Sequence, residues 1–183
     1  MNKILITGGC GFIGSHVTEF FFKKYPKAKI IVFDKITYAA SIKNLDSIRN
    51  SKRIKIIKAN ILNFKKIKEA TKHCDLIIHL AAESHVDNSF ELNNEFINTN
   101  VLGTKNVMQA CKENKVKKII HVSTDEIYGE IFNGNFDESA KFNPSNPYSS
   151  SKAAAEMIVN GYIHSYKLPV MIVRANNIFG TRQ

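Results

Sequence analysis

Short apolar runs alternate with longer stretches of mixed polarity along this chain of 183 residues. The run Leu-Ile-Ile-His-Leu at 76–80 is apolar enough for a strand covered on both faces, as strands of parallel sheets are. The pattern predicts strands at 3–6, 29–33, 54–58, 76–80, 118–122 and 169–173. It predicts helices at 12–24, 42–49, 63–72, 93–114 and 147–166.

Strands that alternate with helices indicate an α/β fold with a parallel sheet and right-handed crossovers. We expect a Rossmann-like, doubly wound sheet with strand order 3-2-1-4-5-6 and a ligand site at the carboxyl ends of the strands. The length is ordinary for one domain, so residues 1–183 are expected to fold as a single unit.

A glycine-rich turn joins the first predicted strand to the first helix. Gly8 allows the tight turn, Gly11 lets the backbone approach a pyrophosphate, and Gly14 lets the helix lie close to the strand. Phe12 and Ile13 open the helix, whose free N–H groups and dipole favour phosphate binding. The spacing is G-x-x-G-x-x-G, whereas most dehydrogenases have G-x-G-x-x-G, so a glycine turn without a ligand is the alternative.

The second strand ends at Asp34, twenty residues after Gly14. A carboxylate there can accept both ribose hydroxyls of an adenosine and would repel a 2′-phosphate. Lys35 would favour that phosphate, but Asp34 occupies the strand end, so the predicted cofactor is NAD. Asn60 and Ile61 follow the third strand and are expected beside the adenine.

The loop after the fourth strand is expected to line a cofactor and substrate site. Small side chains there let a flat cofactor lie against the backbone, and Ser84 would face the substrate. The predicted cofactor contacts in this loop are Leu80, Ala81, Ala82 and Glu83. For His85 and Asp87, hydrogen bonding within the loop is an equal alternative to catalysis.

A tyrosine and a lysine open the last predicted helix. Asn146 and Pro147 suit the N-cap and first helical positions, so Tyr148 lies in the first turn. Lys152 follows four residues later and shares its face. An ammonium nearby, helped by an oxidised nicotinamide ring, favours the phenolate, which would make Tyr148 a general base. The Tyr-x-x-x-Lys spacing is common by chance and gains weight here only from its place after the fifth strand.

Polar residues also follow the fifth and sixth strands. Thr124 can bond the same substrate hydroxyl as Tyr148. Two adjacent acids, Asp125 and Glu126, would be costly to place in a closed cavity without a function; a solvated turn is the alternative. The pair Asn176-Asn177 lies at the same predicted sheet edge.

The composition limits the other possibilities. The net charge of +10 suits an anionic sugar nucleotide, while a nucleic-acid surface is the weaker alternative because the lysines are scattered. The three cysteines, Cys10, Cys74 and Cys111, have no metal spacing and indicate free thiols. No apolar run suits a membrane span, and no signal peptide is evident. We therefore expect a cytoplasmic protein with neither metal nor nucleic-acid partner.

These motifs together carry a family resemblance. The stretch 7–14 and the Tyr148/Lys152 pair resemble the extended short-chain dehydrogenase/reductases. Within that group the chain is similar to the nucleotide-sugar 4,6-dehydratases of the dTDP-glucose type. The closer match rests on residues 34–39, 81–87, 123–130 and 146–152. Residues 88–90, Asn-Ser-Phe, resemble the UDP-glucose branch that feeds rhamnose synthesis, so the nucleotide base stays open.

The resemblance implies an internal redox cycle on a bound NAD. Tyr148, with Thr124 and Lys152, would remove the C4 hydroxyl proton as hydride passes to NAD. Glu126 would then take the C5 proton and Asp125 would protonate the departing C6 hydroxyl, giving a 4-keto-6-deoxy sugar. It also implies substrate contacts at Ser84, Thr124, Asp125, Glu126 and Asn176. The further implied cofactor contacts are Thr37, Thr99, Tyr148, Lys152 and Asn177.

The resemblance also bears on assembly and completeness. Family members pair through the helices at 93–114 and 148–166, so a homodimer is expected. They continue beyond the position of Gln183 into a substrate-binding part, which implies that residues 1–183 are the NAD-binding domain and turn over substrate slowly alone. Asn60 departs from the family's usual Asp. A UDP-sugar 4-epimerase and a non-catalytic NAD-binding or dimerising fragment remain alternatives; the Asp125-Glu126 pair argues against the epimerase.

Overall fold

The computed structural model describes residues 1–131 and 133–183. Six strands form one parallel sheet in the order β3-β2-β1-β4-β5-β6, which confirms the predicted topology. The strands are β1 (Lys3–Thr7), β2 (Lys29–Asp34), β3 (Ile54–Lys58), β4 (Leu76–His79), β5 (Ile119–Thr124) and β6 (Val170–Ala175). All six carboxyl ends therefore lie at one edge of the sheet.

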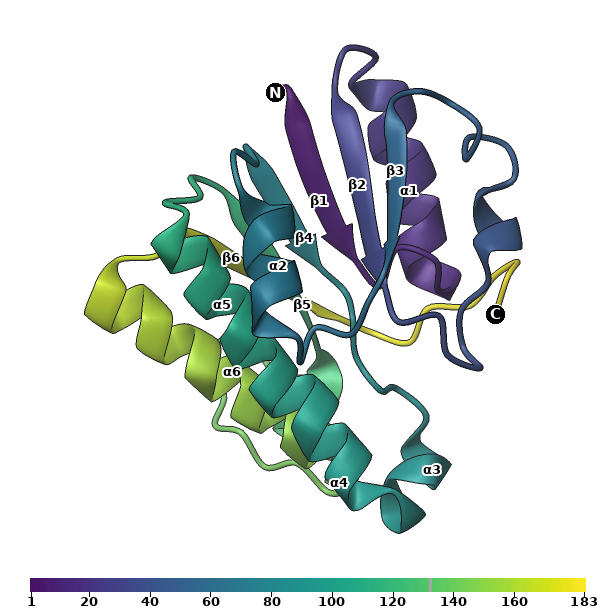
Figure 1. The fold of residues 1–183 in the computed structure, drawn as a ribbon. Coiled ribbons are helices and arrows are strands. Elements are labelled where there is room, and N and C mark those ends of the chain that lie inside the picture. The colour runs from purple at the N-terminus through teal and green to yellow at the C-terminus, as the bar shows by residue number, and fades with distance from the viewer. Residues whose placement is uncertain (132) are drawn as a thin grey trace.

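Helices cover both faces of this sheet (Figure 1). One face packs against α1 (Phe12–Lys24) and the short 3-10 helix η1 (Ile42–Leu45). The other packs against α2 (Phe64–Thr71), α5 (Thr104–Glu113) and α6 (Pro147–Tyr166). No helix in the described part of the chain is long and apolar enough to cross a membrane.

The alternation of side chains along β1 divides the core into two layers. Ile4 and Ile6 point toward α1 and belong to one cluster of buried residues. Leu5 points to the opposite face and joins a cluster with Val107 and Met108 of α5. The strands are apolar on both sides because both sides are covered.

One helical prediction needs correction. The helix expected at 42–49 is only the single turn η1, capped by Ser41 and followed by turns, and the Asn44 amide donates to the distant Cys10 carbonyl at 2.9 Å. The segment predicted as helix at 93–114 is helical from 93 to 113, and it contains α4 (Asn93–Phe96), a π-helical stretch η2 (Ile97–Gly103) and α5. A six-residue helix, α3 (Val86–Glu91), was not predicted because it is too short to show a hydrophobic period.

The glycine turn is held by contacts that leave no room for a side chain. Gly8 has a φ of +71°, and a Cβ there would lie 2.7 Å from the Ala81 nitrogen. A Cβ on Gly14 would lie 1.9 Å from the Gly8 carbonyl oxygen. A Cβ on Gly11 would meet only ordinary contacts, at 3.4 Å and 3.6 Å. The fold itself therefore requires glycine at positions 8 and 14, but not at position 11.

We expect Gly14→Ala to lower the free energy of unfolding by about 3 kcal/mol or more, because helix α1 must move away from the turn. Gly11→Ala should cost about 1 kcal/mol, the difference between glycine and alanine at an N-cap. Urea denaturation of both variants beside the wild type measures this. Equal losses for the two variants would contradict the assignment of Gly14 to packing.

Candidate active site

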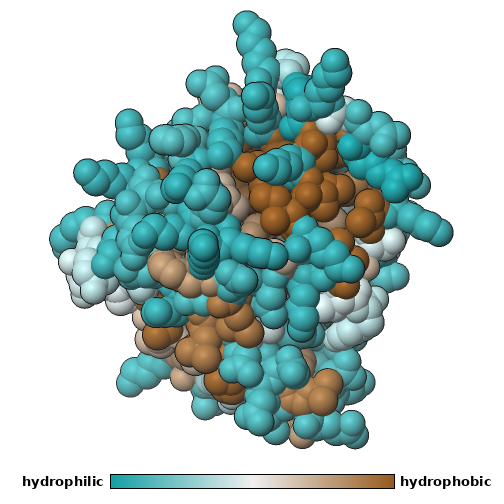
Figure 2. All heavy atoms as spheres, in the orientation of Figure 1, coloured by the Kyte–Doolittle hydropathy of each residue, from teal (hydrophilic) through white to brown (hydrophobic). Residues whose placement is uncertain are grey.

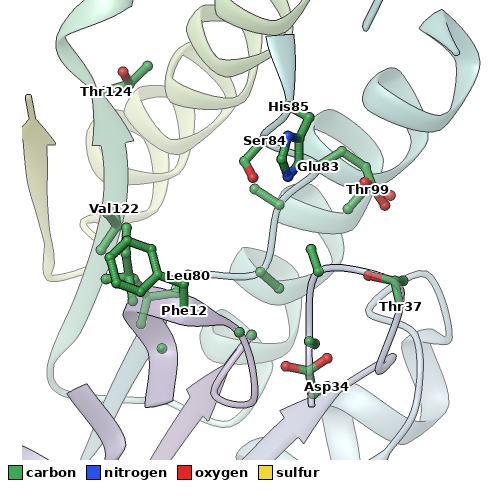
Figure 3. A pocket seen from close by; sticks show the side chains of 18 of the residues that line it. Phe12, Asp34, Thr37, Leu80, Glu83, Ser84, His85, Thr99, Val122 and Thr124 are labelled. Atoms are coloured by element: carbon green, nitrogen blue, oxygen red, sulfur yellow. The ribbon is translucent and has the colours of Figure 1, made fainter. Parts of the chain in front are cut away.

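A cavity of about 570 Å³ opens at the carboxyl edge of the sheet. The loops that follow all six strands contribute to its lining. It is lined by all of the predicted cofactor, substrate and catalytic residues apart from Asp125. Figure 3 shows Asp34 and Thr37 at one end of this cavity, with Val122 and Thr124 of β5 at the other. The volume lies in the range of small-molecule sites.

The glycine turn forms the phosphate end of the cavity. Its backbone is fixed by the Gly8 N–H, which donates to the Phe33 carbonyl at 2.9 Å, and by the Gly11 N–H, which donates to the Gly8 carbonyl at 3.2 Å. The first turn of α1 carries no acidic residue. Since the protein itself leaves space for a Cβ at Gly11, the glycine there suits the close approach of a ligand.

Asp34 is buried at the end of β2 with both carboxylate oxygens engaged. One oxygen accepts from the Cys10 N–H at 2.9 Å and the other from the Ile36 N–H at 2.7 Å. A carboxylate has about four acceptor positions, so each oxygen can still accept a hydroxyl from the cavity. The two backbone bonds fix the orientation that a ribose would meet.

Asn100, in the π-helical stretch η2, is a site residue that the sequence did not reveal. Its side-chain oxygen accepts from the Glu83 N–H at 2.8 Å, and its amide donates to the Glu83 carbonyl at 3.0 Å. The same amide donates to the Ser151 hydroxyl of α6 at 2.8 Å. This buried side chain therefore connects the loop after β4 to η2 and to α6. A lone asparagine within a helical pattern gives no signal of such a role.

Other lining residues were not predicted either. Tyr38 spans two loops: its hydroxyl donates to the Glu83 carboxylate at 3.4 Å and accepts from the Asn88 amide at 3.2 Å. Its ring lies 5.6 Å from that of His85, so His85 takes part in loop contacts. The remaining unpredicted members are Phe33, Ala39, Ala40, Ala59, Val86, Val122, Ser123, Ala175, Ile178, Arg182 and Gln183.

Tyr148 and Lys152 lie together on α6, but their electrostatics differ from the expectation. Burial, together with the carboxylates of Glu126 and Asp125, raises the pKa of Tyr148 to about 12, although a hydrogen bond with Thr124 opposes this rise. The Lys152 ammonium donates to the Val122 carbonyl at 2.7 Å. Burial lowers the pKa of Lys152 to about 8. With no cofactor in the cavity, burial thus favours the protonated phenol of Tyr148. The predicted phenolate, which also relies on an oxidised nicotinamide, stays a prediction.

The two acids after β5 occupy different positions. Glu126 lines the cavity, and its carboxylate accepts from the Asn146 amide at 3.4 Å. The Thr124 hydroxyl caps the turn by accepting from the Glu126 N–H at 3.2 Å and donates to the Asp125 carboxylate at 3.3 Å. Asp125 is therefore bonded to Thr124 and does not line the cavity, whereas Glu126 does. The contact of both acids with a substrate stays a prediction.

Comparison with known proteins places this arrangement in a family. A family model described as GDP-mannose 4,6 dehydratase matches residues 5–183. The chain belongs to this family. The predicted resemblance to nucleotide-sugar dehydratases is therefore confirmed.

Individual members of this dehydratase family are similar over the whole chain. A dTDP-D-glucose 4,6-dehydratase of Dictyostelium discoideum is 45% identical, over 100% of this chain and 45% of the relative. A trifunctional UDP-glucose 4,6-dehydratase, 3,5-epimerase and reductase of Arabidopsis thaliana is 44% identical, over 100% of this chain and 28% of its own. A dTDP-glucose 4,6-dehydratase of Streptomyces venezuelae, solved with NAD bound, is 37% identical with a TM-score of 0.94, over 99% of this chain and 57% of that one.

The chain thus spans about half the length, or less, of the dehydratase relatives that it matches. The predicted catalytic residues all lie within this chain, and its residues alone line the cavity.

The buried Lys152 predicts that the stability of the chain depends on pH. The folded pKa of Lys152 is about 8 and its ordinary value is 10.5, so the unfolded chain binds more protons between these values. Stability should therefore rise with pH across that window. We expect the free energy of unfolding of the wild type, minus that of Lys152→Met, to rise by about 2 kcal/mol from about pH 8 to about pH 10.

Guanidinium denaturation at the two pH values measures this difference. The buried thiols of Cys10 and Cys74 have raised pKa values and act in the opposite direction, but they act equally in both proteins and cancel. A difference that does not change with pH would show that Lys152 keeps its ordinary pKa in the folded chain.

Proposed function

We propose that this chain is the NAD-binding half of a nucleotide-sugar 4,6-dehydratase that acts on dTDP-glucose or UDP-glucose. The observation that carries the proposal is that Tyr148, Thr124 and Glu126 face one cavity that also holds the glycine turn and Asp34. The remaining length of the relatives would supply most substrate contacts. Because remote contacts orient a substrate, we expect turnover by these residues alone to be slow.

The residues present suit NAD as the cofactor. The phosphate end offers the N-terminus of α1 beside Gly11, and the buried Asp34 offers acceptors to a ribose and would repel the 2′-phosphate of NADP. The Streptomyces venezuelae relative holds NAD. When bound, NAD supplies a reversible hydride acceptor beside the sugar.

Tyr148 and Lys152 on α6 serve proton transfer at C4 of the sugar. Tyr148 takes the hydroxyl proton as C4 is oxidised to a ketone, and the Thr124 hydroxyl orients that oxygen. The raised pKa of Tyr148 makes the phenol a poor base by itself. A positively charged nicotinamide ring would favour the phenolate, as the hydrogen bond with Thr124 already does. Tyr148 would then become an effective base only when NAD and the sugar nucleotide are both bound in the cavity.

Loss of water uses the acids after β5. The C4 ketone makes the C5 proton acidic, and Glu126 in the cavity wall removes it. The C6 hydroxyl leaves as water with a proton from Asp125, whose carboxyl group is hydrogen-bonded to the Thr124 hydroxyl in the cavity wall. Hydride then returns to C6 and the proton to C5. A 4-epimerase needs none of this C6 chemistry, so the acid pair favours the dehydratase.

We also propose that the chain forms a homodimer through η2, α5 and α6. Several apolar residues that first suggested this interface are instead core: Phe96, Val107, Met108 and Ala153 are buried within the chain. The apolar side chains of these helices that remain available for an interface are Ile97, Leu102 and Met157, which are 48%, 49% and 52% exposed. Figure 2 shows apolar side chains among polar ones on the face where these helices lie.

The separate roles of the acid and the tyrosine predict different arrests. Mixed with NAD and dTDP-glucose or UDP-glucose, Glu126→Gln should accumulate reduced nicotinamide, because C4 is oxidised but water is not lost. Tyr148→Phe should accumulate none. Near-ultraviolet absorbance after rapid mixing measures both, and Glu130→Gln, the same change outside the cavity lining, serves as the control. Identical behaviour of the first two variants would contradict the assigned roles.

The proposed interface predicts a concentration-dependent mass. At micromolar concentration the wild type should be a dimer by light scattering, and Leu102→Glu or Met157→Glu should be monomeric, because each places a charge among apolar contacts. Phe20→Glu on α1, where the side chain is 54% exposed, should leave the dimer intact. A monomeric wild type would refute the proposed assembly.

A further inference from the structure

Arg174 of β6 joins three elements around a fully buried carboxylate. Its Nε and Nη2 groups donate to Glu156 of α6 at 3.1 Å and 2.5 Å, and Glu156 has no exposed surface. Its Nη1 group donates to the Glu138 carbonyl at 3.1 Å and to the Tyr128 hydroxyl. The guanidinium also lies 5.2 Å from the ring centroids of both Tyr128 and Phe142.

The chemistry of this contact requires arginine. A buried carboxylate must be paired, and the planar fork of a guanidinium can bind both of its oxygens while donating elsewhere. Glu156 uses both oxygens on Arg174, at 3.1 Å and 3.3 Å from Nε. The remaining Nη1 donor is therefore directed at the Tyr128 hydroxyl. A lysine could pair with Glu156 but could not reach both partners with fixed geometry.

Two partners of Arg174, Glu156 and Tyr128, are close in sequence to predicted catalytic residues. Glu156 lies one helical turn beyond Lys152 on the same face of α6. Tyr128 ends the 3-10 turn η3 (Asp125–Tyr128), two residues after Glu126. Between α6 and η3, the bond from the Asn146 N-cap to Glu126 is long, at 3.4 Å. Arg174 thus provides the charged link between the helix of the general base and the turn of the acids.

We propose that Arg174 is a positioning residue that sets the distance from Glu126 and Asp125 to Tyr148 through the Tyr128 hydroxyl. The inference rests on the proposed function for its catalytic consequence, but the geometric part stands without it. Arg174 does not line the cavity, so it acts through Tyr128 and Glu156. Loss of the Tyr128 hydroxyl frees η3 while the ion pair with Glu156 remains.

The test compares Tyr128→Phe with Tyr162→Phe in the chain of 183 residues. Each variant loses one hydroxyl bond: Tyr128 accepts from Arg174, whereas Tyr162 of α6 donates to Gln109 at 2.9 Å, away from η3. The phenylalanine ring keeps the packing of Tyr128 against Phe142. Arg174→Lys is the third variant, since it keeps a cation for Glu156 and loses the fork.

The first readout is the ionisation of Tyr148, followed by carbon-13 tyrosine resonances and assigned with Tyr148→Phe. In Tyr128→Phe and Arg174→Lys the two carboxylates should move away from the phenol, so Tyr148 should ionise at lower pH than in the wild type. Tyr162→Phe should titrate like the wild type. An unchanged Tyr148 titration in Tyr128→Phe overturns the proposal.

The second readout separates the two chemical stages with NAD and the sugar nucleotide present. Tyr128→Phe should slow loss of water by about tenfold or more through displacement of the acids, while oxidation at C4 changes little. Reduced nicotinamide should therefore persist in that variant and not in Tyr162→Phe. Equal persistence in both variants overturns the proposal. If the wild type forms neither reduced nicotinamide nor keto product, the proposed function fails, and the titration still decides the role of Arg174.

Discussion

The close approach of the glycine turn to the end of β4 is the constraint on which the cavity depends. Gly8 lies so near the backbone of Ala81 that no side chain fits between them, and Gly14 rests on the Gly8 carbonyl. The Thr7 hydroxyl strengthens the junction by accepting from the N–H groups of Leu80 and Ala81, both at 3.3 Å. These contacts bring α1 and the loop after β4 to the two sides of one opening. A cavity at the sheet edge follows from backbone packing before any catalytic side chain is considered.

Burial then shifts the pKa values of titratable side chains in and beneath this cavity. His79 accepts or donates at both ring nitrogens, to Thr7 at 2.7 Å and Thr104 at 3.0 Å, and burial lowers its pKa to about 3. Lys152 has its pKa lowered and Tyr148 has its pKa raised for the same reason. Near neutral pH, burial therefore favours the uncharged forms of His79 and Tyr148 and weakens proton binding by Lys152. Formation of the Tyr148 phenolate would then depend on what enters the cavity, which suits a reaction that should begin only with substrate and cofactor together.

The sequence was sufficient for the features that depend on local pattern. The strand order followed from the alternation of apolar runs and helices, and the cavity residues followed from their places just after strands, because parallel strands end at one edge. Side-chain contacts between distant segments could not be read in this way. The bonds of Asn100 to Glu83 and of Arg174 to Glu156 join residues 17 and 18 positions apart whose partners no periodicity specifies.

The errors have physical causes of the same kind. The Tyr148 prediction considered the charges of Lys152 and of the nicotinamide. It did not consider burial, which raises the pKa of Tyr148, or the Val122 carbonyl, which accepts a hydrogen bond from the Lys152 ammonium. Asp125 was expected in the cavity because it adjoins Glu126, yet adjacent residues in a 3-10 turn point in different directions. The apolar residues of α5 that suggested a partner turned out to pack against the sheet.

The central claim is that one cavity oxidises C4 and then delivers the same hydrogen to C6. Deuterium placed at C4 of dTDP-glucose or UDP-glucose tests this most directly, with the product examined by mass spectrometry and deuterium NMR after prolonged incubation with the chain and NAD. The account predicts a 4-keto-6-deoxy product with deuterium at C6. Deuterium retained at C4 of an epimerised sugar, or a product that has lost it to solvent, would contradict the account.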